Sequence, residues 1–119
     1  MTVERQATGN QGEDLACVFL QKRQYQIIAR NYRCKIGEMD IVARDREYLV
    51  FCEIKTRRGS GSIHPTASIT ARKIRKLRQL GLFYMRQYRL YHLQPRFDVI
   101  AIQLHTDREP TIEHFINAL

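Results

Sequence analysis

The chain has 119 residues, and 44% of them are hydrophobic, so it fits one domain with a single modest core and is not disordered. Its formal net charge of +8 points to an anionic partner, either nucleic acid or an acidic membrane surface. A basic surface that only keeps the protein soluble is the alternative. No run approaches the about 18 apolar residues of a membrane helix, and the polar first 14 residues contain no apolar signal-peptide core.

The cysteines and histidines show no pattern of a metal site. Cys17, Cys34 and Cys52 are odd in number, without Cys-x-x-Cys spacing, and each lies in an otherwise structured segment. We therefore predict reduced, buried thiols in a cytoplasmic protein. The four histidines are scattered, and we interpret them as loop, surface or sheet residues.

Residues 1–8 are predicted to be a flexible N-terminal tail, and residues 9–119 a single domain. A helix follows, with Asn10 as a plausible N-cap. Its apolar stripe consists of Leu15, Ala16, Phe19 and Leu20. Glu13 falls in the predicted first turn, where the helix dipole favours negative charge, so a dipole role and a catalytic role both remain open.

Three strands come next, over residues 25–34, 38–44 and 49–57. Short turns join them, which predicts an antiparallel meander. In the second strand, alternation predicts that Met39 and Ile41 point to one face and Asp40 to the other. The third strand is apolar on both faces until Glu53 and Lys55 appear, which is typical of a central strand covered on both sides.

The second half of the chain supplies a helix and one or two strands. Residues 57–66 have the Gly, Ser and Pro content of a loop, and this loop is placed to close over a substrate. A basic helix is predicted over residues 68–88, and a buried strand over residues 96–104. Residues 111–115 suggest a final short strand. The apolar stripe predicted to face the sheet consists of Ile74, Leu77, Gly81, Tyr84 and Tyr88. The fold class is α/β, with a central mixed sheet flanked by helices.

Asp40, Glu53 and Lys55 carry the predicted chemistry. Burying an unpaired charge is costly, so Glu53 and Lys55 are expected where their strand leaves the core and meets a cleft. A solvated salt bridge is the alternative. Neighbouring strands are about 4.8 Å apart, so Asp40 can converge on the same point. Two carboxylates are suitable ligands for Mg²⁺ or Mn²⁺. The metal would activate a water molecule for attack on a phosphodiester bond. A lysine beside the carboxylates would stabilise the negative charge that develops in the transition state.

Two further groups would complete a nuclease site. Glu13, brought in by the first helix, would hold the metal or a metal-bound water. Basic side chains would grip backbone phosphates without reading sequence. The predicted nucleic-acid contacts are Arg57, Arg58, Arg72, Lys73 and Lys76.

These motifs resemble the YraN family of uncharacterised bacterial proteins. The similarity covers residues 9–104 and rests on Gly12-Glu13, GEMDIVARD from Gly37, LVFCEIKTR from Leu49, Lys73, and RFDVIAI from Arg96. That family looks like a branch of the PD-(D/E)xK nucleases close to archaeal Holliday junction resolvases. The resemblance implies the restriction-endonuclease-like core, α-β-β-β-α-β.

The resemblance also assigns roles to single residues. Asp40 matches the first motif aspartate, Glu53 and Lys55 match the E-x-K motif, and Glu13 matches the helical acid of the resolvase-like branch. Met39 stands where the superfamily name implies proline, a residue that ligates nothing. Resolvase-like relatives often act as dimers, which implies a possible homodimer.

The leading hypothesis is a divalent-metal-dependent endonuclease of DNA, acting on branched or single-stranded substrates. The second is a non-catalytic nucleic-acid-binding module on a nuclease-like fold. The third is a protein whose basic helix meets an acidic protein or lipid.

Overall fold

The computed structural model describes residues 3–59 and 69–119. Its elements follow in the order α1 (Val3–Lys22), β1 (Gln26–Cys34), β2 (Gly37–Asp45), β3 (Tyr48–Arg58), α2 (Ala71–Gln87), β4 (Gln94–Leu104) and β5 (Thr111–Phe115). The strands form one sheet in the order β1-β2-β3-β4-β5. β3 and β4 run parallel, and the other neighbouring pairs are antiparallel. The predicted mixed sheet and α-β-β-β-α-β core are confirmed, with β5 as an additional strand.

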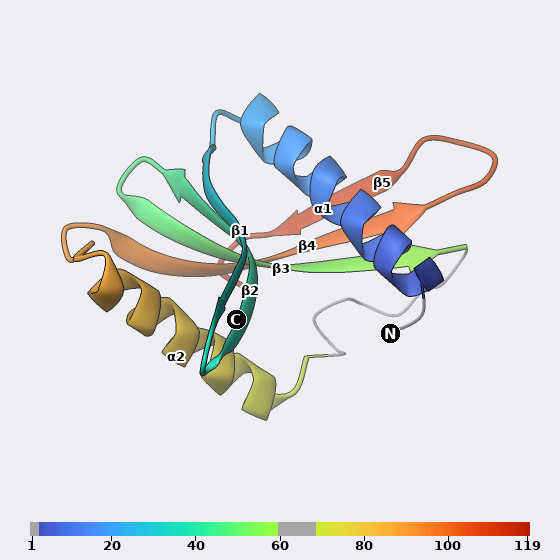
Figure 1. Cartoon of the computed structure of the whole chain (residues 1–119). Helices are drawn as coiled ribbons and strands as arrows, with labels where there is room; N and C mark the ends of the chain where they lie inside the picture. Colours follow the sequence, from blue (N-terminus) through green and yellow to red (C-terminus); the bar gives the residue numbers. More distant parts are fainter. Residues whose placement is uncertain (1–2, 60–68) are drawn as a thin grey trace.

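The sheet is the middle of three layers (Figure 1). α1 covers one face and buries Ala16 and Leu20 against Ile41 and Val50. α2 covers the other face and packs on it through the buried residues Leu77, Leu80, Tyr84 and Met85. Because β3 is central and both faces are covered, its residues Leu49 to Glu53 are all buried, as the two-sided apolar pattern predicts.

Helix α1 begins earlier than the sequence signals indicate. Residues 3–8, for which a tail is predicted, are helical, and the predicted cap at Asn10 is wrong. The segment Glu4 to Ala7 consists of good helix formers, so propensity continues the helix past Gly9. Glu13 therefore lies well inside α1, where the dipole of the first turn no longer explains it.

The alternation of β2 changes at Asp40. Met39 packs on the α2 side together with Val42, whereas Ile41 packs on the α1 side. The prediction that Met39 and Ile41 share a face is therefore wrong. In β1, Asn31 lies between the residues that pair with Ile41 and Met39, and its φ is +53°. This left-handed residue opposite Asp40 marks a local irregularity that simple alternation does not anticipate.

The rest of the chain follows the predictions closely. α2 starts after an N-cap at Thr70 and ends at Gln87, and Tyr88 of the predicted stripe is exposed rather than buried.

All three cysteines are free, and Cys17 and Cys52 are buried while Cys34 is half-buried. The predicted closing loop lies largely outside the described residues. In the part of the chain that is described, no helix is long and apolar enough to cross a membrane.

Gly12 sets the distance between α1 and β3. A methyl group at this position would lie 1.9 Å from Oγ1 of Thr56 and 2.9 Å from its Cβ. Real side chains never approach that closely, so only glycine allows this packing. The close approach brings the neighbouring Glu13 to the sheet.

Gly12→Ala should lower the free energy of unfolding by about 1–3 kcal/mol, because the added methyl group forces α1 away from β3. Gly9→Ala is the matched control on the same helix, where a methyl group meets no described atom within 4 Å. The control should be stabilised by about 0.5–1 kcal/mol. Urea denaturation measures both effects. A Gly12→Ala variant as stable as the wild type would contradict the prediction.

Candidate active site

The candidate site lies where β2 separates from β3. The paired residues of these strands run from Asp45 and Tyr48 to Ile41 and Cys52. Beyond that point, Oδ2 of Asp40 accepts a hydrogen bond of 2.9 Å from the backbone N–H of Ile54. The carboxylate thus takes the place of a ladder carbonyl, which fixes Asp40 at the fork between the two strands.

Glu53 is the buried acid of the site. Only 7% of the residue is exposed, and its Oε1 lies 3.8 Å from Nζ of Lys55 and 3.8 Å from Nζ of Lys73. The side chain of Thr70 caps α2 by accepting from the backbone N–H of Lys73, which fixes the first turn of that helix. The predicted ion pair of Glu53 with Lys55 is present, but burial of the carboxylate distinguishes it from a solvated salt bridge.

Glu13 approaches the fork from α1. Its side chain is 13% exposed, and its Oε1 is buried without a hydrogen-bond partner among the described residues. Nη2 of Arg30 is 4.0 Å from the same oxygen, while its stronger contact is a 2.7 Å ion pair with Asp14. Asn31 also hydrogen-bonds Glu13. A buried carboxylate oxygen without a donor is an incomplete arrangement that a cation or a bound water would complete.

The acids are close enough to affect one another's protonation. Burial, followed by the charge of Asp40, raises the pKa of Glu53 to about 7, although Lys73 and Lys55 act in the opposite direction. Burial and then Asp40 also raise the pKa of Glu13 above its ordinary value. Burial raises the pKa of Asp40 as well, against the hydrogen bond from Ile54. Clustered carboxylates with raised pKa values are typical of functional sites.

The donor set fits a divalent cation in chemical type, although it is not gathered into a ready-made coordination shell. Within residues 3–59 and 69–119, no three His, Cys, Asp or Glu side chains lie together closely enough to hold a metal ion. Hard oxygen donors are nevertheless what Mg²⁺ and Mn²⁺ prefer. Asp40 repels both Glu53 and Glu13 electrostatically, and a cation near these carboxylates would relieve that repulsion. These three residues are the candidates to hold it.

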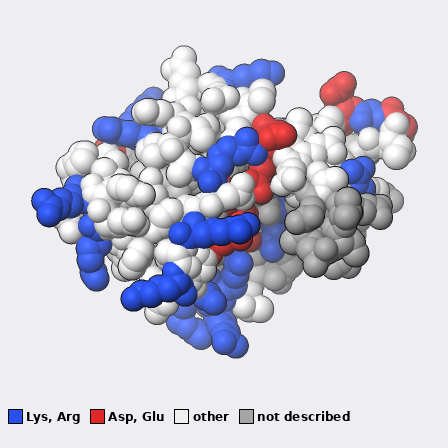
Figure 2. Space-filling view, viewed as in Figure 1, with Lys and Arg blue, Asp and Glu red and all other residues white. Residues whose placement is uncertain are grey.

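Basic side chains surround the acids. In Figure 2, acidic side chains lie near the middle of the face shown, and Lys and Arg side chains lie on both sides of them. Arg72 and Lys76 are exposed on α2, as expected of phosphate contacts. Arg57 is half-buried near the end of β3. Arg58 is exposed and donates a 2.8 Å hydrogen bond to Oγ1 of Thr8 on α1.

Three basic or polar residues near the acids were not assigned there from the sequence. Lys73 reaches Glu53, whereas we predicted only a phosphate contact. It precedes Leu77 by four residues on the buried stripe of α2, which is the signal that it faces the sheet. Arg30 and Asn31 contact Glu13 from β1, and no periodicity in the sequence indicates this.

A second buried polar cluster lies away from the acids. Asp98 is fully buried and accepts hydrogen bonds from Arg96, from Nε2 of His114 at 2.7 Å, and from the backbone N–H of Asn117. It ties β4 to β5 and to the C-terminal residues. From the sequence, His114 is interpreted only as a loop, surface or sheet residue, and no sequence pattern indicates the network.

Comparison with known proteins gives one consistent family. A model of the uncharacterised protein family UPF0102 matches residues 12–102. A UPF0102 protein of Syntrophotalea carbinolica is 42% identical over 118 residues, 99% of this chain and 95% of the relative. One of Geobacter sulfurreducens is 44% identical over 110 residues, 92% and 86% of the two chains. One of Geotalea uraniireducens is 41% identical over 115 residues, 97% and 91% of the two chains.

Proposed function

The chain belongs to the UPF0102 family, the YraN-like family that its motifs resemble, and we propose that it is a divalent-metal-dependent endonuclease of DNA. The observation that supports this proposal most is the environment of Glu53. A carboxylate with a pKa of about 7, beside Asp40 and two ammonium groups, is costly for stability. Such a cost is typical of a site where charge is arranged for chemistry.

Each residue of the site has a separate role in this proposal. Asp40, Glu53 and Glu13 would hold Mg²⁺ or Mn²⁺. The bound ion would lower the pKa of a water molecule and neutralise charge on the phosphate. Lys55 is 31% exposed and its ammonium lies 3.8 Å from Oε1 of Glu53, where it would donate to the scissile phosphate or orient the attacking water. Lys73 lies on α2, which covers the sheet, and its ammonium offsets the negative charge of Glu53 on β3.

The surroundings of the site fit a polyanion. The net charge of +8 and the exposed basic residues Arg72 and Lys76 favour phosphate contacts made without regard to sequence. The proposal also includes the form of the DNA, which would be branched or single-stranded. It further includes a cytoplasmic location and a homodimer.

The test is cleavage of linear, nicked, flapped and four-way-junction DNA with Mg²⁺ or Mn²⁺. We expect metal-dependent cutting of at least one substrate. Lys55→Ala should lower the rate by about 10²–10³-fold, the loss expected when one preorganised electrostatic donor is removed. Lys35→Ala, an exposed lysine in the β1–β2 turn, is the matched control and should cut normally. Full activity of Lys55→Ala would remove this lysine from the chemistry.

One observation favours the non-catalytic module as a second candidate. The described residues contain no preassembled group of three metal ligands. Salt-sensitive DNA binding without cleavage under any divalent metal would support that module and overturn the endonuclease proposal.

A further inference from the structure

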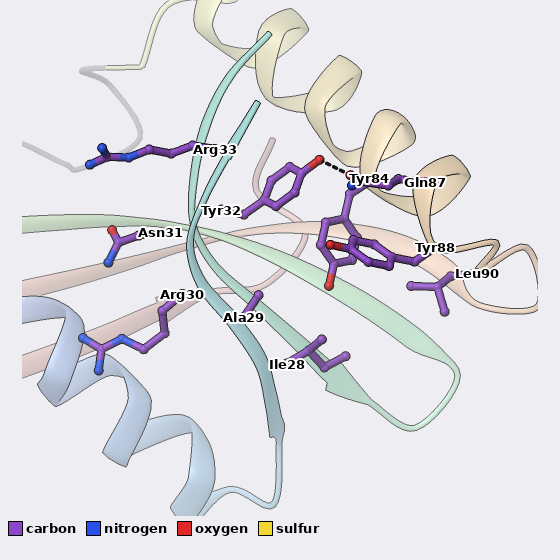
Figure 3. A pocket seen from close by; sticks show the side chains of 10 residues that line it. All are labelled: Ile28, Ala29, Arg30, Asn31, Tyr32, Arg33, Tyr84, Gln87, Tyr88 and Leu90. Carbon is purple, nitrogen blue, oxygen red and sulfur yellow. Dashed lines mark hydrogen bonds between the residues drawn. The ribbon is translucent and has the colours of Figure 1, made fainter. Parts of the chain in front are cut away.

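A groove lies beside the acids, between the edge strand β1 and the C-terminal half of α2 (Figure 3). Its volume is about 750 Å³, and its walls are residues 28–33 of β1 together with Tyr84, Gln87, Tyr88 and Leu90. Small-molecule sites have volumes of about 300–1,000 Å³, so the groove has room for a nucleotide. Glu13, Asp40, Glu53 and Lys55 are not among its lining residues.

Three tyrosines form an aromatic ladder at this groove. The rings of Tyr84 and Tyr32 make a T-shaped contact with centroids 4.9 Å apart, and the centroids of Tyr84 and Tyr88 are 4.7 Å apart. Tyr84 is 4% exposed and also contacts Phe51 in the core, so the ladder is anchored. The hydroxyl of Tyr32 donates a 2.6 Å hydrogen bond to Oε1 of Gln87. Tyr88 is 52% exposed, so a firmly supported ring faces solvent.

Cations flank the ladder on the other side of β1. Figure 3 shows Arg30 and Arg33 pointing away from the tyrosines, so the strand separates an aromatic side from a basic side. The side chains of Arg30 and Arg33 are 40% and 75% exposed, and each also pairs with a carboxylate at the surface, Asp14 at 2.7 Å and Glu38 at 3.6 Å. Arg30 also lies 4.0 Å from Glu13, so the basic side of the strand continues directly into the acid cluster.

We propose that this groove binds an unpaired nucleotide of the substrate, with its base stacked on Tyr88 and the adjacent phosphates reaching across the edge strand β1 to Arg30 and Arg33. The inference rests on the proposed nucleic-acid function and adds that the substrate has unpaired bases next to the site of cutting. An aromatic ring accepts any base by stacking, whereas a continuous duplex keeps its base faces covered. Positive charge along the same strand complements the phosphates on either side of that base.

Binding without metal tests this independently of cleavage. Fluorescence anisotropy in EDTA would compare a single strand, its fully paired duplex and a forked duplex. Tyr88→Ala should weaken binding to the single strand and the fork by about 5- to 150-fold, the range that stacking of one base supports. Duplex binding should stay unchanged. Tyr88→Phe should bind like the wild type, since it keeps the ring face.

Tyr91→Ala is the matched control, because Tyr91 is a 70%-exposed tyrosine outside the groove, and its loss should change nothing. A fluorescent purine analogue at the unpaired position should be quenched by the wild type and not by Tyr88→Ala. Equal losses on duplex and fork, or no loss with Tyr88→Ala, would overturn the inference. So would a wild-type dimer that Tyr88→Ala converts to a monomer, because the groove would then bind a second copy.

The two proposals fail in different ways. Tyr88-dependent binding without cleavage under any metal would overturn the endonuclease and leave the nucleotide groove standing. Metal-dependent cleavage with binding that does not depend on Tyr88 would do the reverse.

Discussion

Glu53→Gln should be more stable than the wild type at pH 8 and should not cut DNA. The pKa of Glu53 in the folded protein, about 7, exceeds its ordinary value of 4.5. The neutral carboxyl therefore favours the folded protein. This contribution to the free energy of unfolding is fully present below pH 4.5 and is lost as the pH rises through about 7. The difference between the two pKa values corresponds to about 3 kcal/mol of lost stability at pH 8. Glutamine stays neutral at every pH, so Glu53→Gln should recover up to that amount.

Urea denaturation at pH 5 and pH 8 measures this gain, which should be small at the lower pH. Glu113→Gln is the matched control, since Glu113 is an exposed glutamate on β5, and it should show little difference at either pH. Mg²⁺ should raise the melting temperature of the wild type more than that of Glu53→Gln, because a cation relieves the repulsion that the substitution already removes. A gain of equal size at both pH values would contradict the assigned protonation.

Asp98→Ala should lower the free energy of unfolding by about 3–5 kcal/mol, because it removes the buried carboxylate that accepts hydrogen bonds from Arg96 and His114. Among the described residues, the buried guanidinium of Arg96 then keeps only Asp45 as an acidic partner. The total free energy of unfolding of most domains is only about 5–15 kcal/mol, so this loss is large. Chemical denaturation at pH 7 measures it. Asp107→Ala, in the exposed turn between β4 and β5, is the matched control and should change little. A loss below about 1 kcal/mol for Asp98→Ala would contradict the buried pairing.

The same network should make the wild type sensitive to acid. Burial alone would raise the pKa of Asp98, but hydrogen bonds from His114, Arg96 and Asn117 outweigh burial and lower it below the ordinary value. The stabilisation by Asp98 is therefore present above about pH 4 and is lost as the pH falls through the lowered pKa. Asp98→Ala should lack this part of the acid-unfolding transition.

Much of the fold followed from the sequence because local signals agreed with tertiary structure. The β-rich segments, the short turns and the apolar stripe of α2 predicted the order of elements, and the two-sided apolar run before Glu53 predicted that β3 is central. The convergence of Asp40 on Glu53 followed from strand register, since residues opposite each other in a hairpin are neighbours.

Other features depend on contacts that local patterns do not encode. The change of face at Asp40 accompanies the left-handed backbone of Asn31, which belongs to the neighbouring strand. Lys73 reaches Glu53 only because α2 covers that face of the sheet. The pairing of Asp98 with His114 joins strands whose register cannot be read from either one alone.

The position of β4 beside β3 has a consequence for synthesis of the chain. Glu53 and Lys55 lie on a strand whose parallel neighbour begins only at Gln94, after α2. A growing polypeptide that has not yet reached that point leaves β3 as an open edge of the sheet. The acids thus acquire their final surroundings only after β4 has been synthesised.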